Sequence, residues 1–353
     1  MDRPTIEKYR FETGVYRPPS EGGSQSLLLR LTRNCPWNRC AFCGMYKGEK
    51  FSIRPVAEIK QDIDAIAALC EDLRAASQSQ GADGAIDHNA VIALIALVPE
   101  LDYHQGLAMV FNWLTSGAGT VFLQDANSLI MKTGQLVEVL QYLRSAFPSI
   151  YRITTYARSR SLVQKTAEAL NAIRQAGLDR LHVGLETGDE ALLKKINKGV
   201  TAQGHIEGGR KAMQAGFQLS EYWMPGLGGK AMWEAHAMGT ARVLNEINPH
   251  YIRSRPFYPL PGTMLSEASR QGGFQLLSAQ EQLLELKLMI THLEVDAKVC
   301  FDHAGNYWKD RHGRLLFTQS YEGYQFPSQK QEVLERIAEG LKARNRRPNL
   351  LNL

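Results

Sequence analysis

The sequence predicts an α/β protein folded as a partial (β/α)6, TIM-like barrel, with an inserted helical segment and a mostly helical carboxyl-terminal extension. Three observations support this prediction. Six short apolar runs alternate with helical patterns between residues 26 and 255, a polar stretch followed by a helical one interrupts the alternation near residue 75, and residues 276–343 are mainly helical in pattern. Alternating strands and helices are typical of parallel β/α units. Six units are too few to close an eight-stranded barrel.

The predicted elements follow from the periodicity of apolar residues. The predicted strands are 26–31, 120–123, 151–156, 180–185, 218–224 and 251–255. The predicted helices of the barrel are 56–73, 136–146, 161–176, 190–196, 205–215 and 233–247, and those of the extension are 276–293 and 331–343. We therefore expect a lead-in over 1–25, a core over 26–265 with a helical insertion at about 75–119, and an extension over 266–353.

Composition indicates a globular protein with a sizeable core, because 44% of the 353 residues are hydrophobic and 22% are charged. The longest apolar run, 90–98, is too short to cross a bilayer, and 1–10 has no apolar segment typical of a secretory signal. These features, with several cysteines, favour a cytoplasmic location without membrane association. The net charge is +5. Its basic run at 342–347 is more typical of a solvated terminus than of a nucleic-acid site.

Three of the five cysteines lie within nine residues, at Cys35, Cys40 and Cys43. Cysteine thiolates hold iron–sulfur clusters, and three of them leave one iron of a [4Fe–4S] cluster open to a small molecule. A structural zinc usually takes four ligands, and only Cys40 and Cys43 form a C-x2-C pair. Disulfides are less favoured in a protein with a large core. Cys70 lies on an apolar helix face and Cys300 is isolated.

Polar residues follow each of the other predicted strands. In β/α proteins functional residues collect on the loops after the carboxyl ends of strands, so we expect a site there. Taken singly, each residue has a simpler explanation as a helix cap, an ion-pair partner or a turn. The candidates are Gln124, Asp125 and Asn127; Thr155, Tyr156 and Arg158; Glu186; Met224; and Arg255.

Two separate motifs give the chain a resemblance to the radical S-adenosylmethionine (radical SAM) superfamily. The first is the cysteine loop, with Phe42 just before the last cysteine. The second is residues 181–189 followed by 196–199, which is similar to the Elp3/MiaB/HemN-like radical SAM core. The resemblance covers about residues 26–265. It departs from the family in its spacing, C-x4-C-x2-C instead of C-x3-C-x2-C, and in lacking a literal GGE motif.

The resemblance implies a [4Fe–4S] cluster on Cys35, Cys40 and Cys43 that chelates S-adenosylmethionine (SAM). It implies that residues 124–127 contact the methionine amino group, that Thr155, Tyr156 and Arg158 contact ribose and carboxylate, and that Met224 lies near adenine. Glu186 occupies the family's fourth-strand position, and Arg255 belongs to the same cofactor-binding set. An oxygen-sensitive enzyme with a reducing partner such as flavodoxin or ferredoxin is expected.

The expected reaction is hydrogen-atom abstraction from a small-molecule substrate. Asp302 and His303 are candidate catalytic residues, because both can transfer protons, and Tyr307 and Trp308 could line a pocket. A polar turn packed by two aromatic residues explains the same segment equally well. The isolated Cys300 argues against an auxiliary cluster. The alternative function is a non-catalytic haem- or cofactor-binding protein similar to HemW.

Overall fold

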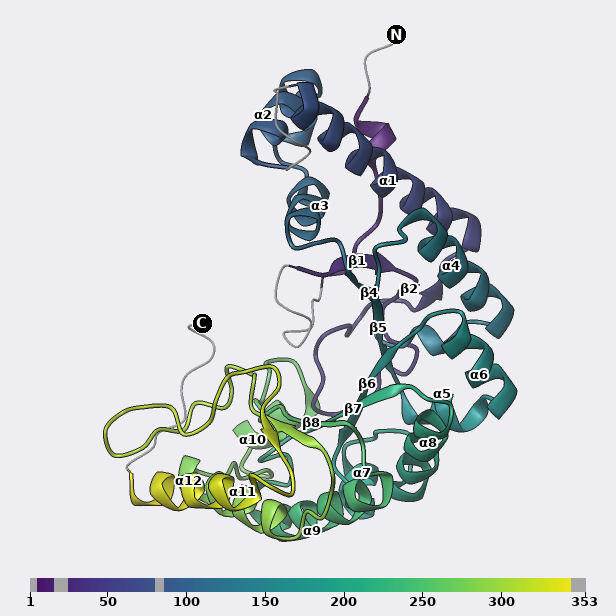
Figure 1. Ribbon diagram of the computed structural model, residues 1–353. Helices are drawn as coiled ribbons and strands as arrows, with labels where there is room; N and C mark the ends of the chain where they lie inside the picture. The colour runs from purple at the N-terminus through teal and green to yellow at the C-terminus, as the bar shows by residue number, and fades with distance from the viewer. Residues whose placement is uncertain (1–4, 16–24, 80–85, 344–353) are drawn as a thin grey trace. The chain divides into compact units, whose positions relative to one another are not determined.

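The computed structural model describes residues 5–15, 25–79 and 86–343 (Figure 1). The chain divides into two compact units. The first comprises the described parts of Met1–Pro36, Lys50–Tyr156 and Asn171–Arg180, and the second those of Trp37–Glu49, Ala157–Leu170 and Leu181–Leu353. Two predicted features lie outside the described residues. They are the glycine- and proline-containing end of the lead-in and most of the basic run at 342–347.

The α/β class predicted from the sequence is confirmed. The strands of the main sheet follow the order β1-β4-β5-β6-β7-β8-β9-β10, and the sheet is mostly parallel. Within the described residues this order is linear, with β1 and β10 at its two ends, so the strands do not form a closed ring. All six predicted strands are present in it.

In the first unit, β1 (Leu27–Arg30) pairs in parallel with β4 (Thr120–Gln124), and β4 pairs with β5 (Arg152–Ala157). The register places Leu27 opposite Val121 and Val121 opposite Ile153, all fully buried. A short antiparallel pair, β2 (Thr32–Arg33) and β3 (Ser52–Ile53), flanks the cysteine loop. The β4 strand therefore carries its carboxyl end, and the polar residues after it, on a rigid apolar support.

The helices of the first unit include α1 (Val56–Ser79) and α4 (Thr133–Ala146), which pack against each other. The predicted insertion contains α2 (His88–Leu97), the short 3-10 helix η3 (Pro99–Leu101) and α3 (Gln105–Thr115). Helix α1 runs past its predicted end at residue 73, because Ala76 and Ser77 are buried in the same stripe as Ile66 and Leu73. Tertiary packing thus extends a helix whose end has a polar, loop-like composition.

In the second unit, β7 (Gln218–Trp223) and β8 (Tyr251–Ser254) pair in parallel, and β8 pairs in parallel with β9 (Lys298–Cys300). β10 (Tyr324–Gln325) joins β9 in antiparallel fashion. β6 (Arg180–Glu186) precedes them in the order. β9 and β10 were not predicted, because strands of two or three residues leave no readable alternation.

Several helices of the second unit begin at side-chain caps directly after the loops of interest. α7 (Glu190–Lys195) begins at Asp189, whose carboxylate accepts the Leu192 N–H, and α8 (Ala202–Gln214) is capped by Thr201. α9 (Gly229–Ile247) follows the loop after β7. The predicted helix 161–176 is two helices, α5 (Ser159–Gln164) and α6 (Ala167–Gln175).

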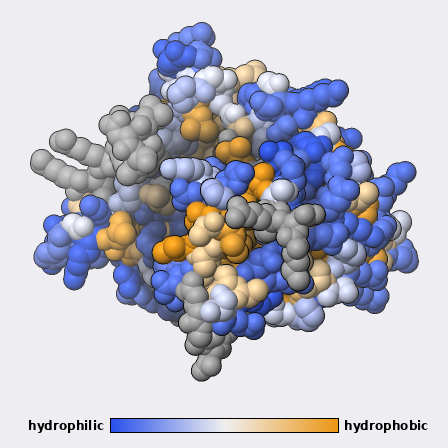
Figure 2. Space-filling view, turned by 90° about the horizontal axis from the view of Figure 1, so that it is seen from above, coloured by the Kyte–Doolittle hydropathy of each residue, from blue (hydrophilic) through white to orange (hydrophobic). Residues whose placement is uncertain are grey.

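The extension contains α10 (Met264–Arg270), α11 (Ala279–Thr291) and α12 (Lys330–Lys342). Trp308 is fully buried there and donates its indole N–H to the Ala279 carbonyl at 3.1 Å. On the face drawn in Figure 2, hydrophilic residues predominate and hydrophobic ones form small patches. Among the described helices, none combines the length and apolarity needed to cross a membrane.

Candidate functional site

The cysteine loop joins β2 to β3. Asn34 and Asn38 have φ angles of 65° and 45°, a left-handed conformation that asparagine tolerates better than most residues. All three loop cysteines are free of disulfides; Cys40 is buried, while Cys35 and Cys43 are half-buried. The Cys43 N–H donates to the Cys40 carbonyl at 3.3 Å, which forms a tight turn between these two residues.

The part of the loop after Cys35 is anchored in the second unit. The Ala41 N–H donates to the Ile196 carbonyl at 2.8 Å, and the Ala41 carbonyl accepts the Leu265 N–H at 3.0 Å. These three residues belong to one buried apolar cluster, against which Phe42 packs. The Trp37 indole N–H donates to the Asn197 carbonyl at 2.7 Å. The loop is therefore held by the segment that follows α7.

At the end of β4, Gln124 and Asp125 bind other parts of the first unit. The Gln124 amide exchanges two hydrogen bonds with the backbone of Gly14, at 2.8 and 3.2 Å. The Asp125 carboxylate accepts the Arg30 guanidinium at 2.6 Å and the Asn34 N–H at 2.9 Å. Asp125 thereby fixes the first residue of the cysteine loop, and Gln124 holds the lead-in over the end of β4.

Thr155, Tyr156 and Asn127 lie near the same strand ends. Thr155 is fully buried, and its hydroxyl bonds to the Leu123 carbonyl at 3.0 Å and the Ser128 hydroxyl at 2.8 Å. Tyr156 is half-buried and meets the Phe122 ring edge-on at 5.0 Å. Asn127 is 1% exposed. Thr155 serves the packing of this region, whereas the half-buried Tyr156 keeps part of its surface accessible.

At the end of β6, Glu186 lies in an ion pair with Lys198, with Nζ 2.8 Å from Oε1 and both side chains largely buried. Glu186 has a φ of 63°, a strained value for this residue type. Its carboxylate lies over Gly184, where an added Cβ would come within 2.2 Å of Oε1. Arg158 donates to the Lys198 carbonyl at 2.6 Å and stacks on Trp37. The structure therefore brings Glu186 and Arg158 together through Lys198.

The loop after β7 is tied to the loop after β6. The Met224 N–H donates to the Glu186 carbonyl at 3.0 Å, and the Met224 carbonyl lies 3.0 Å from His236 Nε2. The other ring nitrogen of His236 lies 2.8 Å from the Thr187 hydroxyl. Glu285, from α11, accepts the Gly226 N–H at 2.5 Å. Burial raises the pKa of Glu285 to about 8 and lowers the pKa of His236 to about 4.

Arg255 and Asp302 belong to a further buried group. The Asp302 carboxylate accepts Arg253 at 3.0 Å on one oxygen and Arg255 at 3.2 Å on the other. Despite burial, these two guanidinium groups lower the pKa of Asp302. Burial lowers the pKa of His303 to about 4, with Arg255 contributing in the same direction. Asp302 is thus an ionised ion-pair partner and His303 a neutral imidazole at pH 7.

One segment of the chain matches a known protein family. Residues 108–238, which run from within α3 to within α9, match the family model of the radical SAM superfamily. The match covers less than half of the chain. The matched segment contains Gln124, Thr155, Glu186 and Met224, while the cysteine loop precedes it. Members of this superfamily bind a [4Fe–4S] cluster and SAM, as the sequence resemblance implies.

Solved radical SAM structures give only remote likenesses. The Elp3 protein of Methanocaldococcus infernus is 13% identical over 64% of this chain and 55% of its own (TM-score 0.45). Methylornithine synthase (PylB) is 15% identical over 90% and 72% (0.45). The radical SAM enzyme HemN of Escherichia coli is 16% identical over 77% and 54% (0.46). This chain therefore spans little more than half of Elp3 and HemN. No curated protein sequence matches it.

The five cysteine thiols differ in how well they suit cluster ligation. Burial raises the pKa of Cys70 and of Cys300 to about 12, so their thiolates are disfavoured. Cys35, Cys40 and Cys43 form a donor set of the chemistry that an iron–sulfur cluster requires. In the part of the chain that is described, no three His, Cys, Asp or Glu side chains are already gathered around a metal position. Ligation by the loop cysteines thus stays a prediction.

Two polar residues of the radical SAM segment were not predicted as site residues, Lys198 and Glu221. Glu221, in β7, is fully buried, and neither of its carboxylate oxygens has a hydrogen-bond partner among the described residues. Burial raises its pKa well above the usual range, with Lys198 opposing this and Glu186 adding to it. The sequence signal for Glu221 was a carboxylate inside a predicted strand. For Lys198 it was its place in the motif at 196–199.

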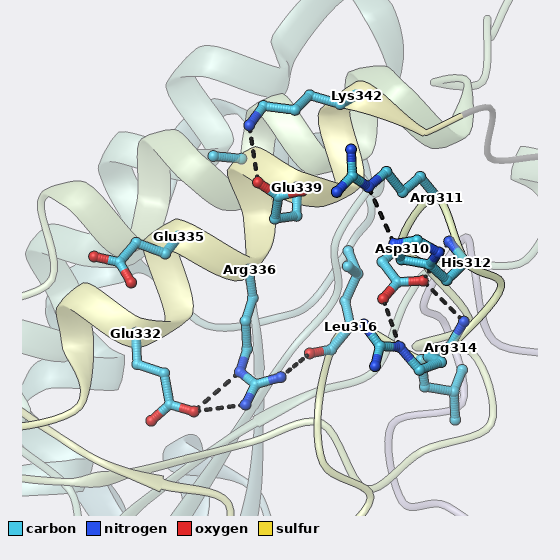
Figure 3. Close-up of a pocket in the computed structure, with 12 residues that line it drawn as sticks. Asp310, Arg311, His312, Arg314, Leu316, Glu332, Glu335, Arg336, Glu339 and Lys342 are labelled. Carbon is cyan, nitrogen blue, oxygen red and sulfur yellow. Dashed lines mark hydrogen bonds and ion pairs between the residues drawn. The ribbon is translucent and has the colours of Figure 1, made fainter.

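One cavity lies elsewhere, between α12 and residues 310–316 of the extension (Figure 3). It has a volume of about 680 Å³, and none of the predicted site residues lines it. Several of its acids and bases are paired with one another, including Arg314 with Asp310 and Arg336 with Glu332. A second cavity of about 490 Å³ lies along α9 and reaches His292. The first cavity lacks the predominantly apolar lining expected of a small-molecule site.

Proposed function

We propose that this protein is a radical SAM enzyme that abstracts a hydrogen atom from a small-molecule substrate. Cys35, Cys40 and Cys43 would hold the [4Fe–4S] cluster. When bound, the cluster supplies the electron that cleaves SAM into methionine and a 5′-deoxyadenosyl radical. The observation that carries the proposal is the set of three disulfide-free cysteines within nine residues, in a chain of which residues 108–238 match the radical SAM superfamily.

The second unit supplies the groups that would receive SAM. Glu186 and Lys198 form a paired acid and base on a strained turn after β6, and Glu221 offers a buried carboxyl with unused hydrogen-bonding capacity. Such groups can bind hydroxyl or ammonium donors of a ligand. Arg158 is oriented by Trp37 and by the Lys198 carbonyl, and the Met224 backbone is fixed by Glu186 and His236. These residues are proposed to position the ribose and adenine of SAM.

The first unit supplies support for the cysteine loop. Asp125 binds the backbone of Asn34, directly before Cys35, and Gln124 binds the lead-in. We propose that Asp125 orients the loop, and that Gln124, Asn127, Thr155 and Tyr156 border the methionine end of SAM. Asp302 and His303 are proposed to lie on the substrate side. Reducing equivalents would come from a flavodoxin or ferredoxin, and the oxygen sensitivity of such clusters favours the cytoplasm.

The test is anaerobic turnover. The protein is reconstituted with iron and sulfide, mixed with SAM and dithionite, and analysed for 5′-deoxyadenosine by chromatography. We expect wild type, Cys70→Ala and Cys300→Ala to form it, and Cys35→Ala, Cys40→Ala and Cys43→Ala to form none.

Two results would contradict the proposal. Full activity in any of the three loop variants would exclude that cysteine as a required ligand. A stable cluster that leaves SAM intact would favour the alternative, a cofactor-binding protein such as a haem carrier.

A further inference from the structure

Arg253 is a fully buried arginine, and most of the polar atoms of its side chain have partners among the described residues. Its side chain is 0% exposed. The guanidinium lies 4.1 Å from the ring centre of Tyr321 and 4.8 Å from that of Tyr251. Nε donates to the Ser220 hydroxyl at 3.2 Å, and Nη1 donates to Asp302 and to the Tyr321 carbonyl. The two ring centres lie only 6.0 Å from each other, so the rings flank neighbouring sides of the guanidinium and do not cover its two opposite faces.

The third nitrogen of the Arg253 guanidinium differs from the other two in its hydrogen bonding. Nη2 of Arg253 is buried and has no hydrogen-bond partner within the described part of the chain. A buried charged donor without an acceptor is costly, so this position calls for an anionic acceptor. Asp302 does not fill that role, because it gives one oxygen to Arg253 and the other to Arg255. Asp302 aligns the two guanidinium groups but forms a bidentate ion pair with neither of them.

The position of this group suits a substrate site. Arg253 and Arg255 stand at the carboxyl end of β8, the edge at which β/α proteins bind ligands. The Arg255 side chain keeps 12% exposure and lies over the Tyr222 ring, so the group has an edge that solvent reaches. His303, beside it, is neutral because its Nδ1 accepts the Gly305 N–H and its pKa is low. A neutral neighbour leaves the guanidinium groups as the dominant charges.

We infer that Arg253 and Arg255, aligned by Asp302, bind a carboxylate group of the substrate. This rests on the proposed radical SAM function and adds to it a substrate class, carboxylic acids. A carboxylate is planar and small, and it accepts two parallel N–H bonds from arginine. The Tyr251 and Tyr321 rings and the acceptors on Nε and Nη1 crowd the guanidinium, which favours a small flat group over a tetrahedral phosphate. Arg255, predicted among the SAM contacts, is reassigned here to the substrate.

The experiment uses the reconstituted protein without reductant and sodium propionate as the probe. Saturation-transfer difference NMR measures propionate binding, and phosphorus line broadening measures inorganic phosphate. We expect propionate to bind and phosphate to bind more weakly. Arg253→Met should weaken propionate binding about tenfold, as for the loss of a charge-assisted hydrogen bond. Arg314→Met removes an exposed arginine of the ion pair with Asp310 and should bind propionate like wild type.

Asp302→Asn gives a test of opposite sign. Asparagine keeps the shape and one acceptor oxygen that align the arginines but removes the negative charge that neutralises them, so propionate binding should tighten. A merely structural role for Asp302 would weaken propionate binding or leave it unchanged. That result, or wild-type binding in Arg253→Met, would overturn the inference. Arg253→Lys serves where Arg253→Met does not fold, and it should also bind propionate more weakly, because lysine presents a point charge.

Two further outcomes would show that Arg253 and Arg255 bind an anion other than a substrate carboxylate. Tighter binding of phosphate than of propionate would overturn the carboxylate class. If Arg253→Met loses SAM binding in equilibrium dialysis and wild type binds no propionate, the anion is the carboxylate of SAM and the substrate assignment fails. Because propionate binding needs neither SAM cleavage nor an electron, failure of the proposed turnover leaves this measurement interpretable.

Discussion

At the scale of single residues, Lys198 decides how the Glu186 turn is held. It neutralises a carboxylate on a residue with a φ of 63°, while its carbonyl holds Arg158. Its side chain is 10% exposed and that of Glu186 is 14% exposed, so removing either partner leaves a mostly buried charge unpaired. This kind of loss is larger than that of a surface ion pair. Lys198 therefore supports both the proposed SAM site and the stability of the turn.

We predict that Lys198→Met lowers the free energy of unfolding by on the order of 2 kcal/mol, because Glu186 loses its partner. Urea unfolding checks the stability, and equilibrium dialysis with SAM should show weaker binding. Lys194→Met, on α7, is the matched control. Lys194 forms no ion pair with any other described residue, and its removal should change neither quantity. Equal effects of the two substitutions would contradict a specific role for Lys198.

Only some residues of the candidate site could be predicted from the sequence. The cysteine loop and Glu186 could be predicted as site residues from spacing and motif, because both signals are local in the chain. Lys198 and Glu221 were missed as site residues, since their significance lies in contacts or burial that only the fold creates. Asp302 was predicted to transfer protons, a role that no observation tests, and the two arginines beside it keep it ionised.

At the scale of elements, helices α9 and α11 fix the loops after β6 and β7. Gly188, after β6, packs so closely on α9 that an added Cβ would lie 2.2 Å from the Gly239 carbonyl oxygen, a backbone atom. From α11, Glu285 accepts the Gly226 N–H. The two loops proposed to receive SAM are thus shaped by helices whose residues lie far away in the sequence.

We predict that Gly188→Ala destabilises the protein by about 2–3 kcal/mol, because a backbone–backbone contact cannot relax as a side chain can. Gly134→Ala, in α4, is the matched control. No atom lies within 4 Å of its added Cβ, and alanine favours helices, so stability should hold or rise by up to about 1 kcal/mol. Thermal unfolding of both variants measures the difference, and similar losses in both would show that the Gly188–α9 contact is unimportant.

The buried Glu285 gives a pH dependence whose sign can be worked out. Its folded pKa of about 8 lies above the ordinary glutamate pKa of 4.5, so between these pH values the folded state holds a proton that the unfolded state has released. Its contribution to stability is therefore present below pH 4.5 and is lost as the pH rises towards 8. His236, with a folded pKa of about 4, acts in the opposite direction between about pH 4 and 6.5.

We predict that Glu285→Gln, which keeps an acceptor for the Gly226 N–H, removes part of the loss of stability between pH 6.5 and 8. Urea unfolding at several pH values measures this difference. Glu281→Gln, on the same helix but partly exposed in an ion pair with Lys230, is the control and should follow wild type over this range. A wild-type pH profile in Glu285→Gln would contradict the protonated state of Glu285.

At the scale of the whole molecule, periodicity was sufficient to predict the α/β class and the six strands from β1 to β8 that alternate with helices. The short strands β9 and β10 could not be predicted, because their stability comes from pairing with β8 and with each other. The single predicted helix 161–176 is interrupted between α5 and α6, at Lys165 and Thr166. Pairing and packing partners, which are distant in sequence, account for these differences.

The central claim is that Cys35, Cys40 and Cys43 hold a [4Fe–4S] cluster with an open iron for SAM. Electron paramagnetic resonance of the reconstituted, reduced protein tests it most directly. We predict a signal typical of a reduced [4Fe–4S] cluster that shifts when SAM is added. The signal should be lost in Cys35→Ala and retained in Cys70→Ala. A signal that SAM does not change, or that survives in Cys35→Ala, would contradict the claim.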